Sequence, residues 1–114
     1  MTIGEIQKLL NARLLCGEAM LDTEVHSACG ADLMSDVLAF VKEQSVLLTG
    51  LLNLQVVRTA EMMDMKCIVF VRGKVPDEAI LTLAAARSIA VMSTDCRMYS
   101  ACGRLYAAGL VGLE

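Results

Sequence analysis

SVLLTG (residues 45–50) and CIVFV (residues 67–71) are the two short apolar runs that decide the fold of this chain. The segment between them, Leu54 to Asp64, has the length and composition of a helix. A strand–helix–strand unit requires a crossover connection, so the two strands are expected to lie parallel in one sheet. Parallel strands are covered on both faces, which explains why neither run alternates apolar and polar residues.

The chain before this unit is predicted to form two helices and two strands. The first helix begins at the capping box Thr2-Ile-Gly-Glu5 and ends at Asn11. The other elements are, in order, a strand over residues 12–16, a strand over residues 24–29, and a helix that Asp32 or Ser35 caps and that runs to about Lys42.

The chain after this unit is predicted to form a helix, a strand and a last helix. Pro76-Asp77-Glu78 is a strong helix start, and Arg87 suits the negative end of that helix. The remaining elements are a strand over residues 89–92 and a helix that Thr94 or Asp95 caps, that runs to about Ala108 and that Gly109 stops.

Gly103 lies inside the last predicted helix, where it costs about 1 kcal/mol relative to alanine. Either another backbone packs closely against it, or it is simply a tolerated glycine. The order of elements is α, β, β, α, β, α, β, α, β, α. This order predicts one compact α/β domain over residues 1–114, with a mainly parallel sheet of about four to five strands and helices on both faces.

The composition is unusually apolar for a small domain. Apolar residues make up 56% of the 114 residues and charged residues 20%, whereas about 45–50% and 25% are typical. A small domain has much surface, so part of this apolar excess must face outward or meet a partner. We therefore expect a homodimer, and the same surface would also suit a partner enzyme.

Charge and hydropathy exclude several classes of protein. The net charge of −3 and the lack of a basic run argue against nucleic-acid binding. No apolar run reaches the roughly 18 residues that a membrane span needs. The N-terminus carries neither the basic nor the apolar region of a secretory signal, so we expect a cytoplasmic protein.

The five cysteines do not predict a metal site or a cofactor. None forms a Cys-x-x-Cys pair, and the only histidine is His26. Zinc and iron–sulfur sites need closer spacing and more ligands. In a reducing compartment these residues are expected to be small buried hydrophobic side chains: Cys16, Cys29, Cys67, Cys96 and Cys102.

Polar residues at the ends of the predicted strands form the candidate ligand site. Ligands of open parallel sheets bind beyond the carboxyl ends of the strands, where helix N-termini present free N–H groups. Two cations among these residues would suit a phosphate or a carboxylate. The candidate set is Thr49, Asn53, Arg72, Lys74, Ser93 and Thr94. The alternative is that these are ordinary turn and capping residues. Arg58 either faces the same rim or pairs with Glu61 or Asp64 at the solvent-exposed surface.

No catalytic motif is found, and we expect no enzymatic activity. Gly73-Lys74 lacks the first glycine of a P-loop, since Ile68 stands there, and Val75 replaces the hydroxyl residue. A Gly-x-Ser-x-Gly elbow is also absent from the sequence. His26 has no recognisable nucleophile or carboxylate beside it in the pattern.

Several of these stretches resemble the DRTGG domain family. The likeness extends over nearly the whole chain and is carried by Leu48 to Gly50, Gln55 to Ala60, Ile68 to Gly73, Pro76-Asp77 and Val91 to Thr94. The namesake residues differ, because Leu52-Asn53 stands in place of Asp-Arg and Val71-Arg72-Gly73 in place of Thr-Gly-Gly. The family occurs as a module of CBS-containing inorganic pyrophosphatases and of some phosphotransacetylases, and is similar to the N-terminal domain of HPr kinase/phosphorylase.

The resemblance implies a noncatalytic, often dimer-forming regulatory domain. Combined with the polar strand ends, it predicts a regulatory or small-ligand-sensing module for an anionic ligand, either phosphorylated or a nucleotide. The alternative is a pure protein-interaction or dimerisation module that docks a partner enzyme and binds no small ligand.

Overall fold

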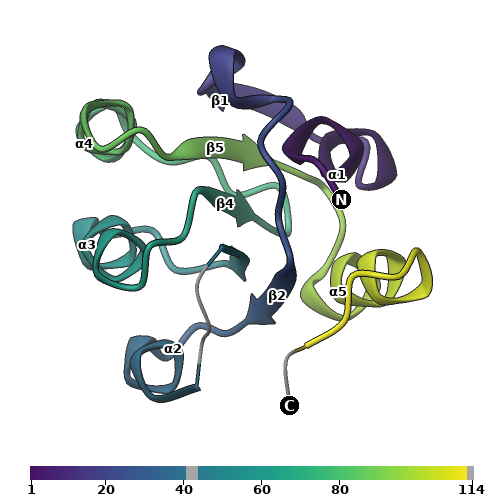
Figure 1. The fold of residues 1–114 in the computed structure, drawn as a ribbon. Coiled ribbons are helices and arrows are strands. Elements are labelled where there is room, and N and C mark those ends of the chain that lie inside the picture. The colour runs from purple at the N-terminus through teal and green to yellow at the C-terminus, as the bar shows by residue number, and fades with distance from the viewer. Residues whose placement is uncertain (41–43, 113–114) are drawn as a thin grey trace.

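Five strands form one sheet in the order β1-β5-β4-β3-β2 (Figure 1). The structure, a computed structural model, describes residues 1–40 and 44–112. The strands are β1 (Arg13–Cys16), β2 (Ser27–Gly30), β3 (Ser45–Thr49), β4 (Cys67–Phe70) and β5 (Ala90–Ser93). The helices are α1 (Ile3–Leu9), α2 (Met34–Phe40), α3 (Leu54–Met62), α4 (Glu78–Ala86) and α5 (Met98–Ala107), with a 3₁₀ turn, η1, at Glu18–Met20.

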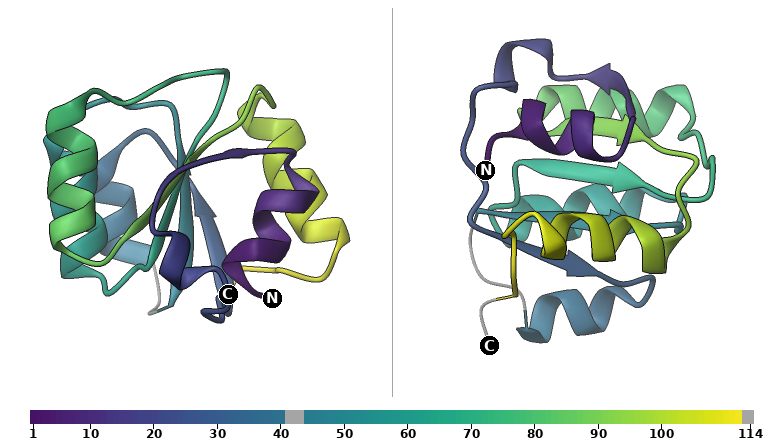
Figure 2. Two further views of the ribbon diagram at one scale, coloured as in Figure 1. Left: turned by 90° about the horizontal axis from the view of Figure 1, so that it is seen from above. Right: turned by 90° about the vertical axis from the view of Figure 1, so that its right-hand side faces the viewer.

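The sheet is mainly parallel and is covered by helices on both faces, which confirms the predicted fold class. Strands β2 to β5 are parallel, and only β1 runs antiparallel, with Arg13 opposite Ser93. Helices α2, α3 and α4 cover one face, and α1 and α5 cover the other (Figure 2). No helix in the described part of the chain is long and apolar enough to cross a membrane.

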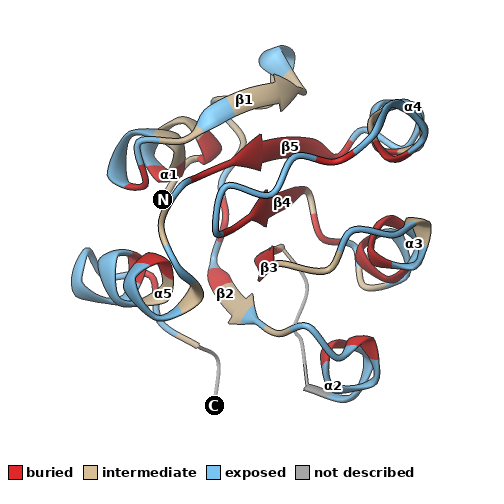
Figure 3. Cartoon of the chain, turned by 180° about the vertical axis from the view of Figure 1, so that it is seen from behind, coloured by how far each residue is buried: buried red, intermediate tan, exposed pale blue. Residues whose placement is uncertain are grey.

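Every residue of β3, β4 and β5 is buried (Figure 3). Successive side chains point to opposite faces of a strand. In β3, therefore, Val46 packs in the core under α1 and α5, and Leu47 packs in the core under α3 and α4. Two-sided burial is the physical reason for the unbroken apolar runs.

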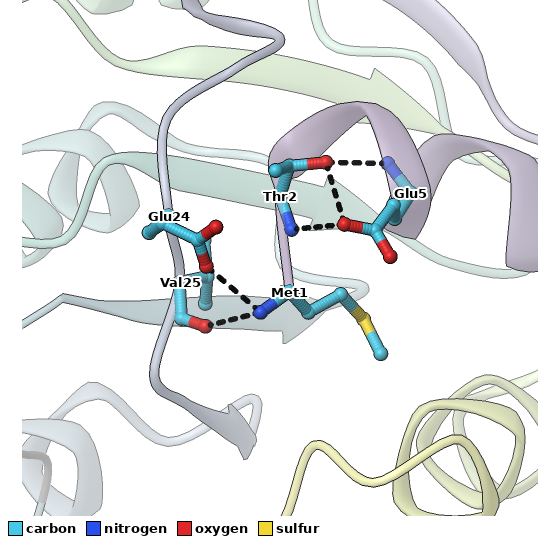
Figure 4. A network of polar contacts seen from close by, with 5 residues as sticks. All are labelled: Met1, Thr2, Glu5, Glu24 and Val25. Atoms are coloured by element: carbon cyan, nitrogen blue, oxygen red, sulfur yellow. Dashed lines mark hydrogen bonds and ion pairs between the residues drawn. The ribbon is translucent and has the colours of Figure 1, made fainter.

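The N-terminal residues are hydrogen-bonded to the segment just before β2. The predicted capping box is confirmed, because Thr2 Oγ1 accepts from Glu5 N at 3.1 Å and Glu5 Oε1 accepts from Thr2 N at 3.1 Å (Figure 4). The Met1 amine donates to Glu24 Oε2 at 3.0 Å, and Val25 N donates to Met1 O at 2.7 Å. Pairing with these residues is why β2 begins at Ser27 and not, as predicted, at Glu24.

One predicted helix cap, Asn53, and the predicted start of α4 at Pro76-Asp77-Glu78 are confirmed. The Asn53 side chain accepts from Val56 N at 3.2 Å at the start of α3. The Asp77 side chain accepts from Ile80 N at 3.0 Å at the start of α4. The last helix also stops where predicted, at Gly109, whose φ of +105° is readily adopted only by glycine.

Two other predicted caps are wrong. Helix α2 begins at Met34, and the carboxylate of Asp32 accepts instead from Gly50 N and Thr49 Oγ1. Ser35 lies inside this helix, and its predicted end near Lys42 falls outside the described residues. Helix α5 begins at Met98 without a side-chain cap, because Thr94 Oγ1 is committed to distant backbone and Asp95 lies in the loop before the helix.

Gly103 is a tolerated glycine and not a point of close backbone packing. A methyl group built on it would meet no described atom within 4 Å apart from its chain neighbours and the backbone of its own helix. Gly17 is the opposite case, because its φ is +93° and a methyl group there would lie 2.7 Å from the Cα of Ala90.

We therefore expect Gly103→Ala to raise the free energy of unfolding by about 1 kcal/mol, because alanine is the better helix former. For a domain of this size the melting temperature would rise by roughly 4–8 °C. Gly17→Ala should lower it, since the backbone of β5 would have to move. Thermal unfolding followed by circular dichroism measures both variants, and a lower melting temperature for Gly103→Ala would contradict the open site.

Candidate functional site

The carboxyl ends of β4 and β5 lie side by side at the point where the chain changes faces. After β4 the chain leads to α4 on one face, and after β5 it leads to α5 on the other (Figure 2). Such a switch point is where parallel α/β sheets usually bind ligands. Because β1 is antiparallel to β5, its first residue also lies here. We call this end of the sheet the carboxyl edge.

Asp32 ties the loops after β2, β3 and β4 together at the carboxyl edge. Its Oδ1 accepts from Gly50 N at 2.8 Å and from Thr49 Oγ1 at 3.0 Å. Its Oδ2 lies 3.8 Å from Arg72 Nη2. The hydrogen bond from Gly50 N lowers the pKa of the Asp32 carboxyl, burial opposes this effect, and the Thr49 hydrogen bond and the Arg72 charge lower the pKa further.

Arg72 is held in an unusual position by its backbone. Its φ is +60°, and the following Gly73 has φ +69°. Arg72 N donates to Cys96 O at 2.8 Å, and Gly73 N donates to Thr94 O at 2.8 Å, which joins the loops after β4 and β5. The guanidinium lies directly over Gly50, where any side chain would collide with it. A left-handed arginine costs about 1–3 kcal/mol, which these contacts must offset.

Four of the six predicted site residues use their side chains inside the chain. Thr49 bonds Asp32, and Asn53 caps α3. Ser93 Oγ donates to Lys74 O at 2.7 Å, and Thr94 Oγ1 donates to Leu10 O at 2.7 Å. The hydroxyl and amide groups of these residues are therefore structural contacts at the edge.

Arg72 and Lys74, the other two predicted residues, keep their charged ends exposed. The Arg72 side chain is 46% exposed despite its contact with Asp32. The Lys74 ammonium forms no ion pair with another described residue, and its backbone carbonyl accepts from Ser93. Arg58 is exposed on α3, and its two expected partners pair elsewhere, Glu61 with Arg87 and Asp64 with Lys66.

Two small hollows open beside β5 at the carboxyl edge. The larger, of about 320 Å³, is lined by Leu10, Asn11, Thr94, Asp95, Cys96 and Arg104. The smaller, of about 140 Å³, is lined by Asn11, Arg13, Gly73, Val75, Ser93 and Asp95. Sequence reasoning missed Asn11, Arg13 and Arg104 as site residues, because only an antiparallel β1 brings the first two to this edge.

Four of the five cysteines are poor nucleophiles in this structure, because burial keeps their thiols protonated. All five are free thiols. Burial raises the pKa of Cys67 to about 12, and burial also raises the pKa of Cys16, Cys29 and Cys102. A raised pKa keeps these four thiols protonated at neutral pH. Among the described residues, no group of three His, Cys, Asp or Glu side chains could hold a metal ion.

Comparison with known protein families confirms the resemblance seen in the sequence, because the model of the DRTGG domain matches residues 5–108. A similar solved structure contains the CBS and DRTGG domains of the regulatory region of Clostridium perfringens pyrophosphatase, complexed with the activator diadenosine tetraphosphate. The TM-score is 0.75 at 16% identity, over 91% of this chain and 45% of that chain. At this identity the likeness shows the fold alone. No curated protein sequence matches the chain.

The Asp32 contacts predict a pH-dependent contribution to stability. Asp32→Ala leaves the buried Thr49 hydroxyl without an acceptor for its proton, which should lower the free energy of unfolding by about 1–3 kcal/mol at pH 7. Because the folded-state pKa is lowered, the contribution of the ionised carboxylate is present above about pH 4 and is lost as the pH falls through the folded pKa.

Urea unfolding at pH 7 and at acidic pH measures this contribution. The difference between the original chain and Asp32→Ala should shrink on acidification, whereas Asp22→Ala, at an exposed turn, should match the original chain throughout. A difference that is constant with pH would show that the charge of Asp32 does not matter.

Proposed function

The chain belongs to the DRTGG domain family, and from this premise we propose that it is a noncatalytic regulatory module that senses an anionic ligand. The ligand is a phosphorylated metabolite or a nucleotide, bound at the carboxyl edge. The observation that carries this proposal is the set of cations at that edge that pair with no described carboxylate: Arg13, Lys74, Arg97 and Arg104.

Electrostatics favours an anion at this edge over one elsewhere. The whole chain has a net charge of −3, yet four of the six described Lys and Arg residues without an ion-pair partner lie at this edge, the other two being Lys8 and Arg58. Arg72 adds a fifth cation that Asp32 compensates only in part, at 3.8 Å and with both side chains about half exposed. An exposed pair at this distance is weak, so an anionic ligand can compete for the guanidinium.

The relative of known structure supports a nucleotide as one form of this ligand. It is a regulatory region, and it was complexed with a nucleotide activator. The present chain spans 45% of that protein chain. The comparison therefore supports only the class of ligand, and the position of the site is argued from the residues of the present chain. We also propose a cytoplasmic location, because five free thiols suit a reducing compartment.

We further propose that the module is a homodimer that pairs through the outer face of α5. Tyr99 is 91% exposed and Tyr106 is 65% exposed, one helical turn on either side of Gly103. Figure 3 shows this outer face of the helix as largely exposed. Tyrosine is enriched at interfaces because it buries a large area at a small cost in side-chain entropy. A dimer here would cover part of the apolar excess in the composition.

A thermal-shift screen against nucleotides and phosphorylated metabolites tests the ligand. A ligand at about 100 times its dissociation constant stabilises the fold by about 2.7 kcal/mol, and each kcal/mol raises the melting temperature by roughly 4–8 °C. Arg72→Ala and Lys74→Ala should each weaken binding while the protein still folds, because their charged ends face solvent.

Lys66→Ala is the matched control for this screen. Lys66 precedes β4, at the opposite end of the strand from Lys74, and it pairs with Asp64 at 3.0 Å. Its replacement should leave binding unchanged. A screen without any hit, with positive controls working, would favour a docking module that binds no small ligand.

Light scattering after size exclusion tests the dimer. Replacing Tyr99 and Tyr106 together by aspartate should convert the protein from a dimer to a monomer, because charge is costly in a dry contact. Met62→Asp is the control, since Met62 is also 65% exposed but lies on α3. A monomeric original chain would refute the dimer, and dissociation by Met62→Asp would move the contact to the other face.

A further inference from the structure

The two hollows beside β5 are neighbours, because both are lined by Asn11 and Asp95, and together they outline a groove. Arg13 lines only the smaller hollow, and Arg104 lines only the larger. The groove therefore has a carboxylate and an amide at its middle and one guanidinium-bearing residue toward each end. We call it the Asn11–Asp95 groove.

The four polar side chains of this groove are not used by the fold. Asn11, Arg13, Asp95 and Arg104 are exposed, and their side chains make no hydrogen bond or ion pair with another described residue. Ser93 and Thr94, which also line it, are bonded to Lys74 O and Leu10 O. The fold thus fixes the floor of the groove and leaves its charged groups unpaired.

The Asn11 backbone explains why this floor is well defined. Asn11 has φ +48°, and its N–H donates to Lys8 O at 3.2 Å where α1 turns into β1. In the same turn, Leu10 O accepts a hydrogen bond from Thr94 Oγ1 at 2.7 Å. The loop after β5 and the turn before β1 are therefore joined, and Asp95 and Asn11 line the same hollows from these two segments.

The order of charges selects the class of ligand. A guanidinium binds phosphate well, but a carboxylate in the middle of the groove repels a bare phosphate or a polyphosphate. A carboxylate only accepts hydrogen bonds, and two neighbouring hydroxyls are a natural partner for its two oxygens. The amide of Asn11 both donates and accepts. The groove therefore suits a molecule that carries a phosphate together with a vicinal diol.

We propose that the Asn11–Asp95 groove binds the ribose and phosphate of a ribonucleotide, with Asp95 accepting from the ribose hydroxyls and Arg104 or Arg13 binding the phosphate. This inference rests on the proposed function and specifies its ligand and subsite. The larger hollow, of about 320 Å³, is at the small end of ligand sites. This size favours a mononucleotide over a dinucleotide.

Calorimetric titration with adenosine 5′-monophosphate, its 2′,3′-dideoxy analogue, ribose 5-phosphate and inorganic phosphate tests the inference. The original chain should bind adenosine 5′-monophosphate at least about tenfold more tightly than the dideoxy analogue, because loss of the diol leaves the carboxylate without its partners. Guanosine, cytidine and uridine 5′-monophosphates, each with its dideoxy analogue, cover the other bases.

Two variants separate the role of the diol from that of the phosphate. Asp95→Ala should remove the preference for the ribonucleotide, so that both analogues bind with equal affinity. Arg104→Ala and Arg13→Ala together should weaken the binding of the ribonucleotide and of its dideoxy analogue to the same extent. Asp22→Ala, which replaces an exposed acid outside the groove, should change neither. Melting temperatures of all variants establish that they are folded.

The outcomes distinguish this inference from the proposed function. If nucleotides bind without a preference for ribose, or if the preference survives Asp95→Ala, the groove assignment is overturned and the anion-sensing function stands. Inorganic phosphate binding as tightly as the ribonucleotide would also overturn the groove assignment alone. If no phosphorylated compound binds the original chain, both proposals fall.

Discussion

Burial of β3, β4 and β5 on both faces is the constraint on which the rest of the structure depends. Every residue of these strands is buried, and their backbone groups are paired in the sheet. Because α1 and α5 cover one face and α2, α3 and α4 the other, the strands have almost no room for polar side chains within their length. Groups that could bind a ligand are displaced to the strand ends, and the parallel arrangement gathers those ends at one edge.

The loops at the carboxyl edge are hydrogen-bonded to one another, which preforms this edge. Asp32 joins the loop after β2 to Gly50, Gly73 N joins the loop after β4 to Thr94 O, and Thr94 Oγ1 joins the loop after β5 to Leu10 O. Small polar side chains form hydrogen bonds between these loops, and the long cationic side chains project from the loops toward solvent. A preformed edge of this kind loses little entropy on binding, which favours recognition of a small ligand.

The sequence predictions are correct where hydrogen-bonded groups are close along the chain, and they fail where these groups are far apart. The caps Asn53 and Asp77 were predictable, because each accepts from a backbone N–H three residues later. Asp32 and Thr94 carry the same capping signal, yet Asp32 accepts from Thr49, 17 residues away, and Thr94 donates to Leu10, 84 residues away. Local patterns cannot distinguish these cases, because a carboxylate accepts, and a hydroxyl donates or accepts, equally well whether its partner is near or distant along the chain.

The class of fold, the order of its elements and the edge at which polar groups gather could be predicted from local patterns, because apolar periodicity and helix caps are local properties. Which of those polar groups remain unpaired depends on contacts between distant segments. The tertiary structure also placed Asn11 and Arg13 beside Asp95, since that neighbourhood depends on β1 joining β5 in the antiparallel direction. The physical reason is that pairing between distant strands is set by the burial of the whole sheet, which no single segment encodes.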